Sequence, residues 1–387
     1  MKLNKNKTSA LVVTHFAIRT NQGPAAPSIF QYLLKRTKRV FYIEMPFPYA
    51  KVQTLFLSVY ENEALIYQKR VNNLKGPAWA QYLHHFFVCI FFVILSKSRF
   101  DICVACENLS FISIFLFRKI GVIKRIVYYT IDYTDERFPN AFMNFLYHKL
   151  DQLSCKISDI NWVVTKQQIE ARKKRLNFKT SSSFRIVPIG YDLEEFNKTP
   201  AKKISSYQLA YAGAFLEQAG VQLAIKALPF LKTRYPKIKL LIMGSGSYEQ
   251  KLKDLISRLK ISRYVKFLGH VEDFFDLVSF LKGSTIGLAP FLPIHGSVSF
   301  NADSSKIKLY LACGLPVITT EVTTISPILR KYKAGVSINA DEKSLAKAVD
   351  YLFKNKQNYK EYRRKTILLS KKYDINNILD KAFNSLN

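Results

Sequence analysis

The stretch NADSSKIKLYLACGLPVITTE, residues 301–321, predicts a change from helix to strand within a few residues. A polar loop precedes a short helix from about Ser304 to Ala312, and hydroxyl side chains suited to capping stand at its start. Gly314 and Pro316 then end the helix, and the β-branched run 317–320 predicts a buried strand. The stretch is therefore one helix-to-strand unit of an α/β sheet.

Similar units alternate along the whole chain, beginning with the strand-like run at 10–16 and restarting at 208 after a polar segment without periodicity. Alternation at this spacing predicts a parallel sheet with helices on both faces, and 387 residues suit two such domains. We expect two Rossmann-like domains, with ligands in a cleft between the carboxyl ends of their sheets. The expected boundaries are 1–190 for the first domain, 191–206 for a linker, 207–365 for the second domain and 366–387 for a final amphipathic helix.

The chain is strongly basic, with 59 Lys and Arg residues against 28 Asp and Glu residues and a net charge of +31. Residues 1–100 contain only three acidic side chains, Glu44, Glu61 and Glu63. Such an excess favours an anionic partner, which could be a phosphorylated small molecule, an anionic membrane surface or nucleic acid. A Lys-rich composition of the whole proteome is the alternative explanation. The basic helix at 166–175 lacks interleaved aromatic positions, so we expect no nucleic-acid partner.

Five cysteines in mainly apolar runs indicate a reduced, cytoplasmic protein. The spacing CVAC at 103–106 lies in a predicted strand without a second ligand pair, so no metal site is expected. The apolar run at 86–95 is about half the length that spans a bilayer, which predicts a buried or surface-dipping helix.

Glycines follow several predicted strands, at the position where a backbone amide can approach a phosphate. They are Gly23 after the first strand, Gly213 and Gly220 after the first strand of the second domain, and Gly244 and Gly246 after a later one. None completes a known phosphate-binding motif, and each alone could be a simple turn. Their joint placement at strand ends predicts an anion site.

Two carboxylates end predicted strands of the first domain, Asp132 in RIVYYTIDYTDERF and Glu107 in DICVACEN. A carboxylate at a strand end facing the cleft could accept a proton from a hydroxyl or orient a sugar. For Asp132 the alternative is a helix cap or turn former, a role that Asp135 could equally fill. His15 ends the first strand and is expected to point into the same cleft.

The second domain resembles the group 1, family 4-like glycosyltransferases of the GT-B fold. The resemblance covers residues 208 to about 355 and rests on four segments: QLAYAGAFLEQAGVQLAIKAL, KLLIMGSGSYEQKL, VKFLGHVEDFFDLVSFLKGSTIGLAPF and SSKIKLYLACGLPVITT. The first domain is similar in layout, and the tail resembles the helix that crosses back to it. The resemblance implies transfer of a sugar from a UDP- or GDP-linked nucleotide sugar to a hydroxyl acceptor, with retention and without a metal or further cofactor.

The resemblance also implies roles for residues. Gly23, Gly213, Gly244, Gly246, Ser304, Ser305 and Lys306 would bind the donor diphosphate, Asn301 the donor sugar, and Asp132 with Glu107 would act on the acceptor. The chain departs from the family at several positions. Ala214 and Ala219 stand where many members have a basic pair, and Asn301 and Leu309 stand where many have glutamates.

From these observations we expect a membrane-associated enzyme on the cytoplasmic face of the cell membrane. Its acceptor would be lipid-linked or a saccharide, in cell-surface polysaccharide (capsule or lipopolysaccharide) or glycolipid synthesis. The missing glutamates and basic pair leave a second possibility, a non-catalytic GT-B subunit that binds a partner transferase or glycan. A nucleotide-sugar 2-epimerase shares this fold, but the charged cluster expected of one is not evident.

Overall fold

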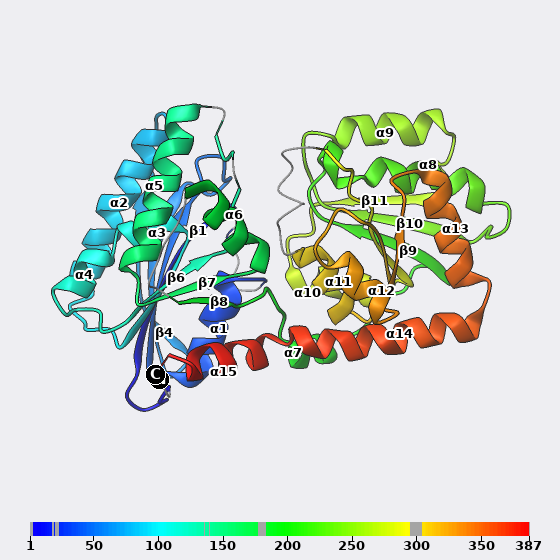
Figure 1. Cartoon of the computed structure of the whole chain (residues 1–387). Helices are drawn as coiled ribbons and strands as arrows, with labels where there is room; N and C mark the ends of the chain where they lie inside the picture. Colours follow the sequence, from blue (N-terminus) through cyan, green and yellow to red (C-terminus); the bar gives the residue numbers. More distant parts are fainter. Residues whose placement is uncertain are drawn as a thin grey trace. The chain divides into compact units, whose positions relative to one another are not determined.

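The computed structural model describes residues 3–17, 19, 23–134, 136–138, 140–176, 183–294 and 304–386. They form two compact units, each built on its own sheet (Figure 1). Unit 1 comprises Met1–Pro188 with Ile378–Asn387, and unit 2 comprises Ile189–Asn377. Both are α/β units, which confirms the predicted fold class.

Unit 1 contains an eight-stranded sheet in the order β4-β3-β2-β1-β5-β6-β7-β8. Its strands are β1 (Ser9–Phe16), β2 (Arg39–Pro46), β3 (Thr54–Glu61), β4 (Ala64–Asn72), β5 (Ile102–Cys106), β6 (Ile126–Thr130), β7 (Ile160–Val163) and β8 (Phe184–Ile186). Its helices are α1 (Ala26–Arg36), α2 (Ala78–Leu95), α3 (Asn108–Ile112), α4 (Phe115–Lys119), α5 (Ala141–Ile157) and α6 (Lys166–Leu176). Six neighbouring strands of this sheet, β2, β1, β5, β6, β7 and β8, run parallel to one another, as predicted.

The hairpin β3–β4 was not predicted, and it makes this edge of the sheet antiparallel. Asn62 and Glu63 form its two-residue turn with φ of 50° and 71°, the left-handed conformation that suits the twist of a hairpin. β4 is largely exposed at the edge, so it lacks the apolar alternation that marks a half-buried strand.

Helices cover both faces of the unit 1 sheet. α2, α3 and α5 lie on one face (Figure 1), where Phe92 and Phe111 join the core beneath them. α1 packs on the other face, and its Phe30 stacks on Tyr42 of β2 with ring centroids 4.5 Å apart. The carboxyl ends of β1, β5 and β6 therefore lie next to α2, α3 and α5.

α2 is the one helix of the described residues that is long and apolar enough to cross a membrane, judged by length and composition. One side of it is buried in the unit 1 core through Val88, Cys89, Phe92 and Val93. The other side is exposed, together with apolar side chains of α5. We call this surface the α2–α5 face, and its residues are Trp79, Leu83, Phe87, Phe91, Ile94, Phe142, Phe145, Leu146 and Leu153. α2 is thus a surface helix with an exposed apolar side.

Unit 2 contains a six-stranded parallel sheet in the order β11-β10-β9-β12-β13-β14. Its strands are β9 (Tyr207–Ala212), β10 (Ile238–Met243), β11 (Val265–Gly269), β12 (Ile286–Ala289), β13 (Val317–Thr320) and β14 (Gly335–Ile338). Its helices are α7 (Leu193–Lys198), α8 (Val221–Leu231), α9 (Glu249–Arg258), α10 (Phe274–Lys282), α11 (Ser305–Ala312), α12 (Ser326–Lys331), α13 (Glu342–Phe353) and α14 (Lys356–Ser370). α8, α9 and α13 pack on one face, and α7, α10, α11, α12 and α14 on the other.

The segment 191–206, expected to be a linker, contains α7 and belongs to unit 2. Asp192 caps this helix by accepting hydrogen bonds from the Glu194 and Glu195 amides, and Tyr191 and Phe196 are buried in the unit 2 core. Two aromatic side chains in an otherwise polar segment are too few to produce a recognisable period.

The tail returns to unit 1 as predicted. The last helix, α15 (Ile375–Asn384), begins in unit 2, and its residues from Ile378 onward belong to unit 1. Tyr32 of α1 donates a hydrogen bond to Asp380 at 2.7 Å and stacks on Phe383 with ring centroids 5.3 Å apart.

Candidate functional site

The glycine turns of unit 2 interlock at the carboxyl ends of β9, β10 and β11. The Gly213 amide donates to the Met243 carbonyl at 2.9 Å, and the Gly244 amide donates to the Gly269 carbonyl at 2.7 Å. A Cβ added to Gly244 would lie 1.9 Å from the Gly213 carbonyl oxygen. These glycines therefore allow two backbone turns to touch, and the Gly213 and Gly244 amides are already hydrogen-bonded within the protein.

Gly246 has the same function in the next turn, because a Cβ there would lie 2.4 Å from the Phe215 carbonyl oxygen. The predicted role of Gly213, Gly244 and Gly246 in ligand binding stays a prediction. In the structure, these glycines allow the backbone turns after the strands to pack closely against one another.

α11 begins beside these turns, as the opening stretch of the sequence predicts. Ser304 is its N-cap and accepts a hydrogen bond from the Ile307 amide at 3.4 Å. The Ser305 and Lys306 amides lie in the first turn, where helical geometry provides no intrahelical acceptor. Asn301, predicted to contact the donor sugar, lies outside the described residues.

Lys306 is the charged group of this site. Its ammonium lies 3.8 Å from the centroid of the Tyr211 ring and 5.0 Å from that of Phe291. Its Nζ would be 3.0 Å from a Cβ on Gly213. Desolvation lowers the pKa of Lys306 to about 7, and no carboxylate in the described part of the chain pairs with it. An anion bound at the start of α11 would supply the missing partner.

Three positions that depart from the family pattern contain no ionisable group. Leu309 is 6% exposed and packs in the unit 2 core, and Ala219 is the buried last residue of a 3₁₀ turn. Ala214 contributes its carbonyl, which accepts a hydrogen bond from the Tyr211 hydroxyl at 2.8 Å. A ligand at α11 would therefore obtain its positive counter-charge here from Lys306.

In unit 1, Glu107 lies directly after β5 with a left-handed φ of 71°, an uncommon conformation for a side chain of this type. Its Oε1 accepts hydrogen bonds from the Ile131 amide at 2.8 Å and the Asp132 amide at 3.0 Å. Desolvation raises the pKa of Glu107 to about 7, and nearby Arg137 opposes the shift. This carboxyl group therefore changes charge near neutral pH.

The structure brings Asp132 and Glu107 together, because the Glu107 carboxyl accepts the Asp132 amide hydrogen bond. The Asp132 side chain is exposed, and its carbonyl accepts a hydrogen bond from Arg137 at 3.4 Å. Gly23 also belongs to unit 1, where its carbonyl accepts a hydrogen bond from Ser28 at 2.6 Å. The other described residues predicted to bind the donor all lie in unit 2.

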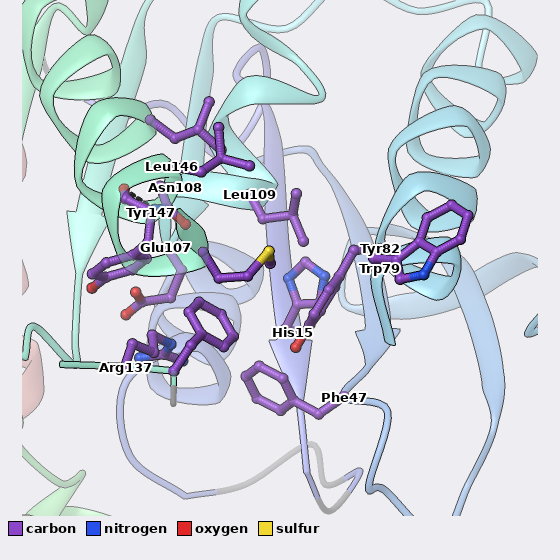
Figure 2. Close-up of a pocket in the computed structure, with 13 residues that line it drawn as sticks. His15, Phe47, Trp79, Tyr82, Glu107, Asn108, Leu109, Arg137, Leu146 and Tyr147 are labelled. Atoms are coloured by element: carbon purple, nitrogen blue, oxygen red, sulfur yellow. Dashed lines mark hydrogen bonds between the residues drawn. The ribbon is translucent and has the colours of Figure 1, made fainter. Parts of the chain in front are cut away.

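A pocket of about 220 Å³ opens beside Glu107 (Figure 2). Its walls come mainly from α2, α3 and α5 and from the loops after β2 and β6. The residues that line it are His15, Phe47, Trp79, Tyr82, Glu107, Asn108, Leu109, Arg137, Phe138, Met143, Leu146, Tyr147 and Leu150. In Figure 2, Glu107 and Arg137 lie together on one side, and Trp79 lies on the opposite side. The pocket is thus mainly apolar, and its charged groups, Glu107 and Arg137, lie together at one side.

His15 reaches this pocket from the end of β1, and its predicted position in a cleft between the domains stays a prediction. Its Nδ1 lies 3.0 Å from the Ser110 hydroxyl, and no described residue forms a hydrogen bond with its buried Nε2. Desolvation and the nearby His85 lower the pKa of His15 to about 3, so the ring is neutral at physiological pH. Sequence reasoning missed Arg137 and the apolar walls, because they come from three helices and two loops that only folding brings together.

Among the residues that the structure describes, no group of three His, Cys, Asp or Glu side chains is placed to hold a metal ion. The five cysteines are free and buried.

Comparison with known proteins gives a consistent result. Residues 193–368 match the family model for glycosyl transferases group 1. The chain is 28% identical over 162 residues to a GDP-mannose-dependent monoacylated alpha-(1-6)-phosphatidylinositol monomannoside mannosyltransferase of Corynebacterium glutamicum. That alignment covers 39% of this chain and 42% of the relative, so the chain spans about two fifths of the length of the curated relative it matches.

Two solved structures share the fold over almost the whole chain. The OtsA apo structure has a TM-score of 0.72 at 15% identity and covers 98% of this chain and 99% of its own. HepE of Anabaena in complex with UDP has a TM-score of 0.64 at 12% identity, with the same coverage.

Proposed function

We propose that this chain, whose residues 193–368 belong to the glycosyl transferases group 1 family and whose fold is GT-B, transfers a sugar from a nucleotide sugar to an acceptor hydroxyl. The observation that carries the proposal is the family match over the unit that contains Lys306. There the Lys306 ammonium, with which no carboxylate of the described residues pairs, lies beside glycine turns and a helix N-terminus. Each of these features favours a diphosphate.

In this proposal unit 2 binds the donor. The Ser305 and Lys306 amides and the Ser304 hydroxyl would bind the phosphates, and the Lys306 ammonium would neutralise them. Asn301 would contact the donor sugar. The base remains open, because HepE was solved with UDP and the Corynebacterium relative is described as dependent on GDP-mannose.

Donor affinity is expected to depend on pH through Lys306. Only its ammonium attracts the diphosphate, and its pKa of about 7 in the free protein means that binding above pH 7 must take up a proton. Affinity for a nucleotide sugar should therefore fall by up to about tenfold per pH unit above 7. Calorimetric titration between pH 6 and 9 measures this, and Lys306→Arg should flatten the profile because arginine stays charged.

Loss of the charge should weaken donor binding at and below pH 7, where the Lys306 ammonium is already charged before the donor binds. Lys306→Ala removes a charge-assisted contact of about 1.5–3 kcal/mol, or roughly 10- to 100-fold in affinity. Exposed Lys266 of unit 2 provides the matched control, since Lys266→Ala removes the same charge elsewhere. Equal donor affinity in the Lys306→Ala and wild-type proteins would contradict the assignment.

Gly213→Ala is expected to weaken donor binding by displacing Lys306. The new Cβ would meet Lys306 Cε at 2.7 Å, at a φ of 145° that disfavours side chains. Gly76 is a close control, because its φ is 153° and no atom lies within 4 Å of an added Cβ. Gly76→Ala should carry a similar backbone strain and leave donor binding unchanged. A loss of affinity of the same size in both variants would rule out the proposed displacement.

Unit 1 would bind the acceptor, with Glu107 and Asp132 at the acceptor hydroxyl. Transfer with retention and without a metal completes the proposal. Metal independence is supported by Lys306, which would neutralise the donor diphosphate in place of a metal ion. The carboxylates at the strand ends, Glu107 and Asp132, support their proposed role at the acceptor. Product stereochemistry, read by NMR, and activity in the presence of EDTA test these two parts separately.

The acceptor is proposed to be lipid-linked or a saccharide, in cell-surface polysaccharide or glycolipid synthesis on the cytoplasmic side of the membrane. Support comes from the α2–α5 face, whose apolar side chains lie on helices with exposed lysines on or next to them, among them Lys75, Lys97, Lys149 and Lys156. Apolar area flanked by cations favours an anionic bilayer. Co-sedimentation with phosphatidylglycerol vesicles, but not with phosphatidylcholine vesicles, is the expected result.

The decisive test of activity is release of nucleoside diphosphate from a panel of UDP- and GDP-sugars, with Lys306→Ala as the control whose donor affinity is reduced. The second candidate is a non-catalytic GT-B subunit, favoured by the apolar side chains at Leu309, Ala214 and Ala219. Thermal shift separates the two, because a non-catalytic subunit that has lost its donor site is not stabilised by any nucleotide sugar.

A further inference from the structure

The unit 1 pocket is distinguished by its chemistry. Nine of the thirteen lining side chains are hydrocarbon, thioether or aromatic: Phe47, Trp79, Tyr82, Leu109, Phe138, Met143, Leu146, Tyr147 and Leu150. Few polar groups are therefore available to satisfy the several hydroxyls of an uncharged saccharide. At about 220 Å³ it is smaller than a typical pocket for a whole drug-sized ligand. It suits a segment of a hydrocarbon chain.

The polar side of the pocket presents a cation. In the described part of the chain, the Arg137 guanidinium makes one hydrogen bond, to the Asp132 carbonyl at 3.4 Å, and no carboxylate lies within 4 Å of it. Most of its donors are therefore open to a ligand, and a guanidinium fork matches a phosphate. The buried His15 Nε2, which no described residue contacts through a hydrogen bond, adds a second polar contact at the pocket.

The pocket also adjoins the α2–α5 face. Trp79 and Leu146 belong to both, and their side chains are 64% and 40% exposed. A hydrocarbon chain bound in the pocket would therefore extend out of it along the α2–α5 face, the apolar surface that we propose contacts the bilayer.

We infer that this pocket binds a lipid phosphate, with the hydrocarbon next to the head group between Trp79 and Leu146 and the phosphate on Arg137. The inference rests on the proposed function, since it names the class of acceptor that presents its hydroxyl to Glu107. It predicts that unit 1 recognises the part of the lipid where the hydrocarbon joins the phosphate, independently of any sugar attached to that phosphate.

The test uses the full chain and the intrinsic fluorescence of Trp79, with decyl phosphate below its micelle concentration as the probe. The other tryptophan, Trp162, is fully buried, so Trp79→Phe should remove the response. Decyl phosphate should bind saturably, whereas inorganic phosphate and decyl maltoside should bind at least tenfold more weakly. Tighter binding of the uncharged maltoside would overturn the inference in favour of a saccharide site.

Two substitutions locate the site. Arg137→Leu should weaken decyl phosphate binding about 10- to 100-fold, the loss of one charge-assisted contact, and Arg137→Lys should restore part of it. Leu146→Asp should also weaken binding, because it places a carboxylate in the apolar pocket. Its matched control is Leu153→Asp, on the same helix with 42% exposure and outside the pocket lining. Unchanged binding in Arg137→Leu and Leu146→Asp, with unaltered melting temperatures, would overturn the inference.

Two further probes distinguish the source of the phosphate. Farnesyl phosphate represents a polyprenyl carrier, and dihexanoyl phosphatidylinositol represents a glycerophospholipid; the tighter ligand identifies the class, and failure of both refutes the inference. Nucleotide-sugar binding, measured separately at unit 2, reports on the proposed function. Lipid binding without donor binding would therefore refute the transferase proposal and leave the pocket assignment supported.

Discussion

Glu107→Gln is expected to lower the rate of sugar transfer by about 10²- to 10⁴-fold, the usual contribution of a positioned acid or base. The Glu107 carboxyl is fixed by the Ile131 and Asp132 amides and lines the pocket where we place the acceptor. Glutamine keeps the shape and can still accept both amide hydrogen bonds, but it cannot take a proton from a hydroxyl. The loss should therefore appear mainly in kcat.

The dependence of the transfer rate on pH provides a second test of the role of Glu107. Because desolvation raises the pKa of Glu107 to about 7, the carboxylate forms only as the pH rises through 7, and the wild-type rate should rise over that range. Arg137 lowers that pKa, so Arg137→Gln should move the rising limb to higher pH. Glu107→Gln should abolish the limb, and a profile unchanged in that variant would contradict the assignment.

Stability should move in the opposite direction to activity. A carboxyl group whose pKa is higher in the folded than in the unfolded state binds its proton more tightly when folded, so folding loses stability as the pH rises from about 4.5 to 7. Glu107→Gln removes this loss, so the variant should gain stability relative to wild type above pH 7. Glu61→Gln, at the end of β3 and outside the pocket lining, controls for loss of a strand-end carboxylate.

Arg172→Met is expected to destabilise unit 1 by about 3–5 kcal/mol, the cost of leaving a buried charge without its partner. Asp151 and Arg172 are almost fully buried and joined by two hydrogen bonds of 2.8 Å, and Arg172 also donates to Thr130 at 2.9 Å. After the substitution, the Asp151 carboxylate would retain the hydrogen bond from the Tyr128 hydroxyl at 2.7 Å. Urea unfolding, followed by a probe in unit 1, measures the loss.

The matched control is Arg118→Met, because Arg118 forms a similar two-bond pair with Asp159 at the surface. Exposed pairs contribute about 0–1 kcal/mol, so this variant should differ little from wild type. Replacing both buried partners, Asp151→Leu with Arg172→Met, should recover much of the lost stability because no buried charge remains. Equal destabilisation by the buried and the exposed substitution would show that the Asp151–Arg172 pair has no special energetic role.

Much of the fold could be predicted from local sequence. β-branched strands such as β13, and helices with marked ends such as α11, produce periodic patterns within a few residues of the chain. The hairpin β3–β4 and the helix α7 could not be predicted in this way. β4 is exposed at a sheet edge, and α7 depends on two aromatic contacts with the unit 2 core.

The residues of the candidate site also differ in whether local sequence could predict them. Glu107, Asp132, Lys306 and the glycine turns stand at strand or helix ends, which sequence patterns mark. Arg137 and the pocket walls depend on tertiary contacts among several elements of unit 1, so no single stretch of sequence indicates them. The altered pKa values of Glu107 and Lys306 arise from desolvation, which is also a property of the assembled unit.

The return of α15 to unit 1 has a consequence for biosynthesis. Tyr32 obtains its partners Asp380 and Phe383 more than 300 residues later, after all of unit 2 has been synthesised. Domains generally fold in order as they leave the ribosome, but unit 1 cannot complete its packing in that order. Until α15 is made, Tyr32 of α1 and the Trp162 ring therefore lack the contacts with Asp380 and Phe383 that they have in the folded protein.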